Sequence, residues 1–301
     1  MLALPWLDRA GRLSWLKLAV FAVALAPGLW YAAAYGFGQL GPKPLTAALH
    51  AMGDWSVRFL ILGLAVTPMR RIAGLPRLIL VRRMLGLTAL AYAAVHLVLY
   101  VADQKFDLVR VATEIAVRFY LTVGFAALVG LAVLGATSTD AMIRRLGQSW
   151  PKLHRLVYTL TALALFHFFL QSKIDVSTPL FWTGLFLALM GWRAMQRFRV
   201  PTNPATLAGL AVVSGLATAG VEYLWYALAT GVPAGAVLAA NLDFYEIRPA
   251  WWVAGIVALT VPLNLVRGGP VRGGPVAGRP SVARPVAGPG PAASSPSLRN
   301  V

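Results

Sequence analysis

Residues 150–173 read WPKLHRLVYTLTALALFHFFLQSK, an apolar run of membrane-spanning length that holds two of the chain's four histidines. An imidazole is costly in hydrocarbon unless it is paired or bound to a metal, so a histidine within a span indicates a functional site. His154 and His167 are 13 residues apart in the sequence, which places them roughly 20 Å apart along a helix axis. We therefore expect one near a rim of the membrane and the other inside the opposite leaflet.

The composition is typical of a polytopic membrane protein. Of the 301 residues, 58% are hydrophobic and only 12% are charged, about half the charged share of soluble domains. The formal net charge of +17 does not indicate nucleic-acid binding, because the cations lie in short loops between apolar runs, as membrane insertion requires. The chain has no cysteine, which excludes disulfides, thiolate metal sites, iron–sulfur clusters and thiol catalysis.

Eight apolar segments each come near the length of about 20 residues that is needed to cross a bilayer. They are residues 16–35, 45–68, 83–102, 119–136, 151–172, 179–198, 205–230 and 250–266. The predicted fold class is therefore an all-α membrane protein, a polytopic helical bundle. We expect residues 1–15 to be a cytoplasmic N-terminus, residues 16–200 a six-helix core, residues 201–266 two additional spans, and residues 267–301 a disordered cytoplasmic tail rich in Pro, Gly and Ala.

The charges of the connections predict the orientation. Cations crowd the connections after the second, fourth and sixth spans, whereas the other connections have few cations or balance them with acids. The positive-inside rule then places both termini in the cytoplasm. The crowded connections contain Arg70, Arg71, Arg77, Arg82, Arg83, Arg144, Arg145, Lys152, Arg155, Arg193, Arg197 and Arg199.

In this orientation His50, His96 and His167 reach a similar depth in the outer leaflet, while His154 lies near the inner surface. Two imidazoles from facing helices are the axial arrangement of a b-type heme, and a heme held without cysteine is non-covalent. We therefore predict that His96 and His167 ligate heme iron, whereas His50 could equally hydrogen-bond at the rim. A heme at His154 would need an unusual second ligand, a water or a partner protein.

Other polar residues leave alternatives open. Arg82 and Arg83 could meet heme propionates or a flavin phosphate, or they could only fix the topology. Asp54 and Arg58 are spaced to pair on one helix face. Glu222, inside the seventh span, could neighbour a quinone or a residue of another helix.

Several motifs resemble those of the MsrQ family, formerly called YedZ. They are TPMRR at 67–71, VRRMLGL at 81–87 leading to AVHL at 94–97, RFYLTVG at 118–124, and TSTDAMIRRLGQSWPKLHRLVY at 137–158. The similarity covers about residues 17–198, so the last two spans and the tail lie outside it.

The resemblance implies a ferric-reductase-like transmembrane domain in the bacterial inner membrane, acting as the heme b-binding subunit of the periplasmic protein-methionine-sulfoxide reductase system. Such a subunit takes electrons from the quinone pool or a flavin reductase and passes them to the molybdopterin reductase MsrP. It is not itself the catalytic reductase subunit. The family is also described as binding FMN, and its heme-linked histidines fall on His96, His154 and His167 here.

Two other functions remain open. A ferric-reductase-like oxidoreductase that acts directly on metal would need a nucleotide-binding donor, which a separate chain could supply. A proton- or ion-coupled transporter could use Glu222, Asp54 and the histidines as its path. A transporter would show no heme absorbance band, so a spectrum of the purified protein separates these readings.

Overall fold

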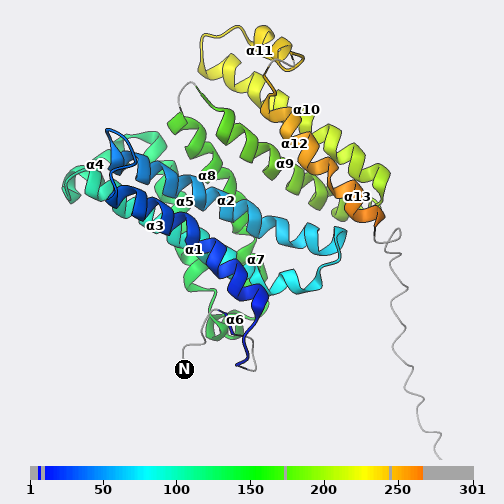
Figure 1. Cartoon of the computed structure of the whole chain (residues 1–301), viewed down its shortest axis with the longest axis horizontal. Coiled ribbons are helices and arrows are strands. Elements are labelled where there is room, and N and C mark those ends of the chain that lie inside the picture. Colours follow the sequence, from blue (N-terminus) through cyan, green and yellow to red (C-terminus); the bar gives the residue numbers. More distant parts are fainter. Residues whose placement is uncertain (1–5, 8–10, 173–174, 244–245, 267–301) are drawn as a thin grey trace, which may run out of the picture. The chain divides into compact units, whose positions relative to one another are not determined.

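The structure is a computed structural model that describes residues 6–7, 11–172, 175–243 and 246–266. Within these ranges every regular element is a helix, which confirms the all-α prediction, while the predicted tail at 267–301 lies outside them (Figure 1). The longer helices are α1 (Trp15–Gly36), α2 (Pro44–Ile72), α3 (Arg82–Asp103), α5 (Phe119–Ala136), α8 (Leu156–Ser172), α9 (Ser177–Arg197) and α10 (Pro204–Ala229). The shorter helices are η1 (Pro76–Val81), α4 (Leu108–Val117), α6 (Asp140–Leu146), α7 (Ser149–His154), α11 (Ala234–Ala240), α12 (Pro249–Ala258) and α13 (Thr260–Leu265).

Six helical segments of the described chain are long and apolar enough to cross a membrane. They are α1, α2, Pro76–Asp103, α5, Ser149–Ser172 and α10. The two other predicted spans are helical but are not in this set: α9 has 21 residues and the apolar segment Pro249–Leu265 is shorter. The chain is therefore a multi-pass membrane protein.

Two spans that the sequence predicts as continuous helices are interrupted in the structure. The expected helix over 250–266 is divided between α12 and α13, because Pro262 has no N–H to bond the Ala258 carbonyl and its ring crowds that carbonyl. The expected helix over 151–172 is divided at Arg155, whose N–H bonds the Lys152 carbonyl, while the Tyr158 N–H bonds the Arg155 carbonyl. Bonds across three residues tighten the helix locally, so His154 ends α7 and is not on the regular helix that carries His167.

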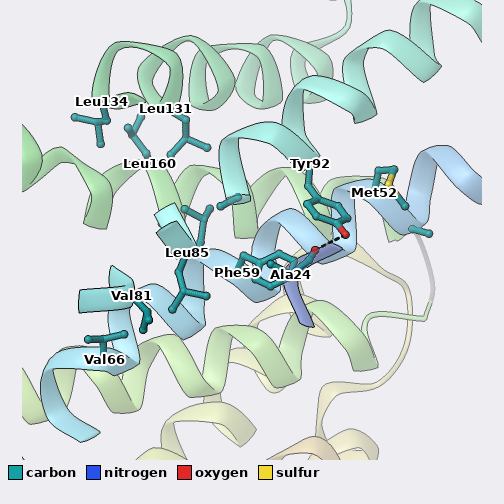
Figure 2. Packing of buried hydrophobic residues seen from close by; sticks show 13 residues of the cluster. Ala24, Met52, Phe59, Val66, Val81, Leu85, Tyr92, Leu131, Leu134 and Leu160 are labelled. Carbon is teal, nitrogen blue, oxygen red and sulfur yellow. Dashed lines mark hydrogen bonds between the residues drawn. The ribbon is translucent and has the colours of Figure 1, made fainter. Parts of the chain in front are cut away.

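The largest core cluster lies where α1, α2, α3, α5 and α8 meet (Figure 2). Ala89 of α3 is fully buried there, and its carbonyl accepts a hydrogen bond from Ser56 Oγ of α2 at 2.9 Å. Small residues allow membrane helices to approach closely. This core fixes α3, the helix that carries His96, against α2. Its buried residues are Ala24, Ala51, Met52, Phe59, Leu60, Val66, Val81, Leu85, Ala89, Tyr92, Leu131, Leu134 and Leu160.

Tyr92 of α3 is bonded into the backbone of α1. Its hydroxyl donates to the Ala24 carbonyl at 2.8 Å, drawn as the dashed line in Figure 2, and accepts the Gly28 N–H at 2.8 Å. In a regular helix these two backbone groups would bond each other, so the hydroxyl bridges a donor and an acceptor of the hydrogen-bond ladder of α1. A Cβ on Gly28 would lie 3.1 Å from the hydroxyl oxygen, so glycine leaves the room for this approach.

Arg193 connects α9 to the helices around the histidines. Its Nη2 donates to the Leu64 carbonyl of α2 at 2.7 Å, and its Nε donates to the Tyr158 hydroxyl of α8 at 3.2 Å. The usual donor to the Leu64 carbonyl would be the N–H of residue 68, but this residue is Pro68 and has none. Arg193 therefore satisfies a carbonyl that proline leaves unpaired inside α2.

The helices α10 and α12 pack against α9 and against each other, on the side of α9 away from α1 and α3 (Figure 1). Glycine makes these contacts possible. A Cβ on Gly184 of α9 would collide with Thr218 of α10 and Val253 of α12, and a Cβ on Gly215 would lie 3.0 Å from Ala254. The last two predicted spans are thus packed onto the six-helix region through α9.

The ionisable residues inside the spans have protein partners. The buried Glu222 carboxylate accepts a hydrogen bond from Asn241 Nδ2 at 2.8 Å and lies 3.4 Å from Arg248 Nη2. Asp54 and Arg58 pair as predicted, at 3.8 Å, and the Arg58 guanidinium lies 4.5 Å from the Trp55 ring centre. Glu222 therefore has a residue partner from another element, one of the two alternatives that the sequence leaves open.

Candidate functional site

The structure brings two of the predicted histidines close together from different helices. His96 of α3 and His167 of α8 have ring centroids 6.4 Å apart, and their ring planes are 80° apart. They come from helices that are far apart in the sequence, and each side chain is half-buried. The prediction that these two imidazoles converge is met by this geometry.

Each imidazole is held from behind by a main-chain carbonyl. His96 Nδ1 lies 2.8 Å from the Leu49 carbonyl oxygen of α2, and His167 Nδ1 lies 2.7 Å from the Tyr120 carbonyl oxygen of α5. A carbonyl oxygen can only accept, so each Nδ1 carries the proton and donates it. The lone pair of a neutral imidazole is then on Nε2, the tautomer that binds a metal through Nε2.

A glycine stands one helical turn after each of these carbonyls. A Cβ on Gly53 would lie 3.0 Å from His96 Nδ1, and a Cβ on Gly124 would lie 2.7 Å from His167 Nδ1. Side chains four residues apart lie on the same face of a helix, so carbonyl and glycine together form a shallow seat for each ring. Neither seat was predicted from the sequence.

The separation of the rings fits a single metal ion between them. A metal–imidazole bond is about 2 Å and the ring centre lies about 1.1 Å beyond the nitrogen, so two imidazoles on opposite sides of one ion have centres roughly 6.2 Å apart. Among the residues that the structure describes, no group of three or more His, Asp or Glu side chains could hold a metal ion. A metal at this pair would take its remaining ligands from a cofactor, as heme iron does from its porphyrin.

A polar network lies beside the pair, centred on Glu114 of α4. The Glu114 carboxylate accepts from the Tyr100 hydroxyl at 2.8 Å and pairs with Arg118 at 3.3 Å and Arg110 at 3.4 Å. The Tyr100 hydrogen bond, followed by the two guanidinium groups, lowers the pKa of the Glu114 carboxyl from its ordinary value. The hydrogen bond from Arg118 to the Tyr120 hydroxyl raises the pKa of the Arg118 guanidinium. Tyr120, whose carbonyl contacts His167, is thus connected through Arg118 to Glu114 of α4.

His50 is not part of the facing pair. Its side chain is exposed, and its Nε2 lies 3.4 Å from Gln171 Nε2. His50 therefore makes a polar contact with Gln171, which is the alternative to heme ligation that the sequence leaves open.

The three other predicted site residues, His154, Arg82 and Arg83, line a cavity of about 550 Å³. The cavity wall is largely apolar, with arginines but no acidic residue in its lining, and Arg83 Nη1 also pairs with the Asp140 carboxylate at 2.5 Å. Such a space suits a flat, largely apolar molecule with anionic groups. Its lining residues are Phe59, Leu60, Gly63, Leu64, Ile79, Arg82, Arg83, Gly86, Leu87, Leu131, Leu134, Gly135, Ser138, Ile143, Trp150, Pro151, His154, Arg155, Val157 and Tyr158.

His154 has a different environment from the facing pair. Its ring stacks on Trp150 with centroids 4.0 Å apart and planes 26° apart. Its Nε2 lies 3.1 Å from the Thr137 hydroxyl, which itself donates to the Val133 carbonyl at 2.8 Å. Thr137 Oγ1 and His154 Nε2 are within hydrogen-bond distance, and which of them donates depends on the tautomer of the imidazole.

The chain was compared with protein families, solved structures and curated proteins. The family model described as "ferric reductase like transmembrane component" matches residues 52–165, which include His96 and His154. No solved structure matches the chain.

Curated relatives are similar over most of their own length. A protein of Rhodospirillum rubrum is 41% identical over 194 residues, covering 64% of this chain and 91% of the relative. A protein of Polaromonas naphthalenivorans is 40% identical over 210 residues, covering 65% of this chain and 96% of the relative. A protein of Xanthomonas oryzae pv. oryzae is 40% identical over 188 residues, covering 60% and 86%. Each is named "Protein-methionine-sulfoxide reductase heme-binding subunit MsrQ".

Proposed function

Because this chain belongs to the MsrQ family, whose members above are named heme-binding subunits, we propose that it carries electrons across a membrane and holds heme b between His96 and His167. The observation that carries the proposal is the 6.4 Å separation of the two rings, with each Nδ1 bonded to a carbonyl. This separation matches two imidazoles bound on opposite sides of one metal ion.

Heme b supplies one-electron chemistry when it is bound. The chain's own residues bind and orient it. His96 and His167 would hold the iron through Nε2, while the Leu49 and Tyr120 carbonyls fix the tautomer and would increase the basicity of each ligand. The buried core beside the pair keeps water from this side, and burial is one of the factors that set a heme reduction potential.

We propose that the 550 Å³ cavity takes a second cofactor. Arg82 and Arg83 would bind its anionic groups, which are carboxylates in a porphyrin and a phosphate in FMN. His154 would contact its ring, using Nδ1 or exchanging its Thr137 contact for a metal. A second heme has groups of this kind, and so has the FMN that the family resemblance implies.

We further propose a place for the chain in the reduction of oxidised methionine. The curated names support a partner reductase, and the proposed partner is the periplasmic molybdopterin enzyme MsrP. In the orientation that the loop charges predict, with both termini on the cytoplasmic side of the inner membrane, the facing histidines lie toward the periplasm. The electron donor would be the quinone pool or a cytoplasmic flavin reductase.

Proteoliposomes test this function. The heme-loaded chain is reconstituted, a quinol or a flavin reductase with its nucleotide is supplied as donor, and purified MsrP with a methionine-sulfoxide peptide is placed on the outside. We expect peptide reduction that requires the chain and is lost with His167→Ala. Equal reduction by empty liposomes, or by the His167→Ala variant, would contradict the proposal.

A further inference from the structure

The two histidine seats have the same construction on two different helices. In α2 the carbonyl of Leu49 accepts a hydrogen bond from His96 Nδ1–H, and Gly53 follows four residues later. In α5 the carbonyl of Tyr120 accepts a hydrogen bond from His167 Nδ1–H, and Gly124 follows four residues later. The carbonyl fixes one atom of the ring, while the missing Cβ leaves room for one orientation of the ring plane. The planes that result are 80° apart.

We propose that Gly53 and Gly124 are positioning residues that hold the two axial imidazole planes crossed. This inference rests on the proposed function, because it concerns the histidines that would bind heme. It adds a feature that heme binding does not require, since two imidazoles can bind one iron with their planes parallel as well as crossed. The crossed arrangement is therefore a property that the glycine seats impose.

Crossed and parallel imidazoles differ in their effect on the iron. Each imidazole donates π-electron density perpendicular to its ring plane, so parallel rings act on one d orbital and crossed rings act on two. Crossed rings leave these two orbitals close in energy, and a ferric low-spin heme then has one very large g value in its EPR spectrum. Parallel rings separate the orbitals and give a rhombic spectrum with a smaller largest g value. Ligand orientation is one way a protein tunes a heme.

The contacts predict how strongly each glycine acts. A Cβ on Gly124 would lie 2.7 Å from His167 Nδ1, 2.8 Å from Cε1 and 3.0 Å from Cγ, so a methyl group there would press on one whole edge of the ring. A Cβ on Gly53 would lie 3.0 Å from His96 Nδ1, 3.1 Å from Cε1 and 3.7 Å from Cγ. The first substitution must turn or displace its imidazole, and the second needs only a small shift.

Gly130 provides the matched control on the same helix as Gly124. A Cβ on Gly130 would collide with the side chain of Leu160 rather than with a histidine. Gly130→Ala therefore disturbs the packing of α5 against α8 without pressing on either ring. Any change that follows from disturbed helix packing alone will appear in this variant too.

The experiment is EPR of the oxidised, purified full-length chain with its bound heme, with heme content measured on the same samples. All variants carry His154→Ala as well, which should remove any heme held at the inner cavity, so that the low-spin signal belongs to His96 and His167. We expect this His154→Ala parent to show the very large g value of crossed imidazoles. Gly53→Ala should lower it slightly, Gly124→Ala should lower it more, and Gly130→Ala should leave it unchanged.

A parent chain with bound heme and the rhombic spectrum of parallel imidazoles would overturn this inference and leave the proposed function standing. So would a shift in Gly124→Ala that is no larger than the shift in Gly130→Ala. If Gly124→Ala binds no heme, the largest g value of Gly53→Ala is compared with that of Gly130→Ala. A lower value in Gly53→Ala supports the inference, and equal values overturn it. A parent chain that binds no heme would overturn the proposed function and this inference together.

Discussion

Tyr92 and His96 lie one helical turn apart on α3, and each connects this helix to a different neighbouring helix. The Tyr92 hydroxyl is bonded into the backbone of α1 through Ala24 and Gly28. His96 faces His167 of α8. Since residues four apart share a helix face, the anchoring of α3 to α1 and the placement of its imidazole depend on the same part of the helix.

Tyr92→Phe should destabilise the protein without removing the histidine pair. The change deletes the hydroxyl that bridges the Gly28 N–H and the Ala24 carbonyl, and buried backbone groups without partners cost about 1–3 kcal/mol. Thermal unfolding in detergent measures the loss. Tyr223→Phe, at an exposed tyrosine of α10, is the control and should unfold like the parent. Equal stability of the two variants would contradict the bridging role.

Arg193→Met should also lower stability, because it removes the donor to the Leu64 carbonyl that Pro68 cannot replace. The unpaired carbonyl alone costs roughly 1–3 kcal/mol. Arg197→Met removes the same charge from an exposed position of the same helix. Unfolding midpoints that fall equally in both variants would show that charge, and not the bond to α2, is responsible.

Filling the inner cavity should displace its cofactor. A Cβ on Gly86 would meet no atom within 4 Å, and this residue lines the cavity. Gly86→Leu therefore should fold and occupy space that a ligand needs. We expect less total heme or flavin per chain, with the low-spin signal of the facing pair retained. Gly209→Leu, at an equally open glycine outside the cavity, should change neither. Full cofactor content in Gly86→Leu would exclude the cavity as a binding site.

The Glu114 network predicts a pH dependence. The Tyr100 hydrogen bond lowers the pKa of the Glu114 carboxyl in the folded chain, so the stabilisation is present above the unfolded-state pKa of about 4.3. It is lost as the pH falls through the lower folded-state pKa. We expect the difference in unfolding midpoint between the parent and Glu114→Gln to be constant from neutral pH down to about pH 5 and to shrink below about pH 4. In a Tyr100→Phe background this difference should be smaller throughout. A difference that grows on acidification would contradict the assignment.

The sequence predicts the features of the fold and the site that depend on spacing and depth. Apolar length predicts the helices, and loop charge combined with helical rise predicts that His96 and His167 meet. The interruptions at Arg155 and Leu259 were not predicted. The apolar run around Arg155 carries no mark of a tightened turn, whereas Pro262 was a usable signal for the interruption at Leu259.

The seats behind the histidines were missed for a different reason. Leu49 and Tyr120 act through their main-chain carbonyls, so their side-chain identity carries no information about the contact. Gly53 and Gly124 look like any small residue in a helix that packs in a membrane. Only the position of a neighbouring imidazole, known once the helices are placed, distinguishes them from glycines such as Gly86, which open onto a cavity.

Heme content per chain, measured by absorbance and by the pyridine hemochrome on the purified parent, His96→Ala, His167→Ala and His50→Ala, tests the central claim most directly. We expect heme in the parent, most of it lost in the first two variants, and content close to the parent in His50→Ala. The exposed His50 is the control for the loss of a histidine from the same end of the bundle. Full heme retention in both His96→Ala and His167→Ala would contradict the claim that these imidazoles hold the iron.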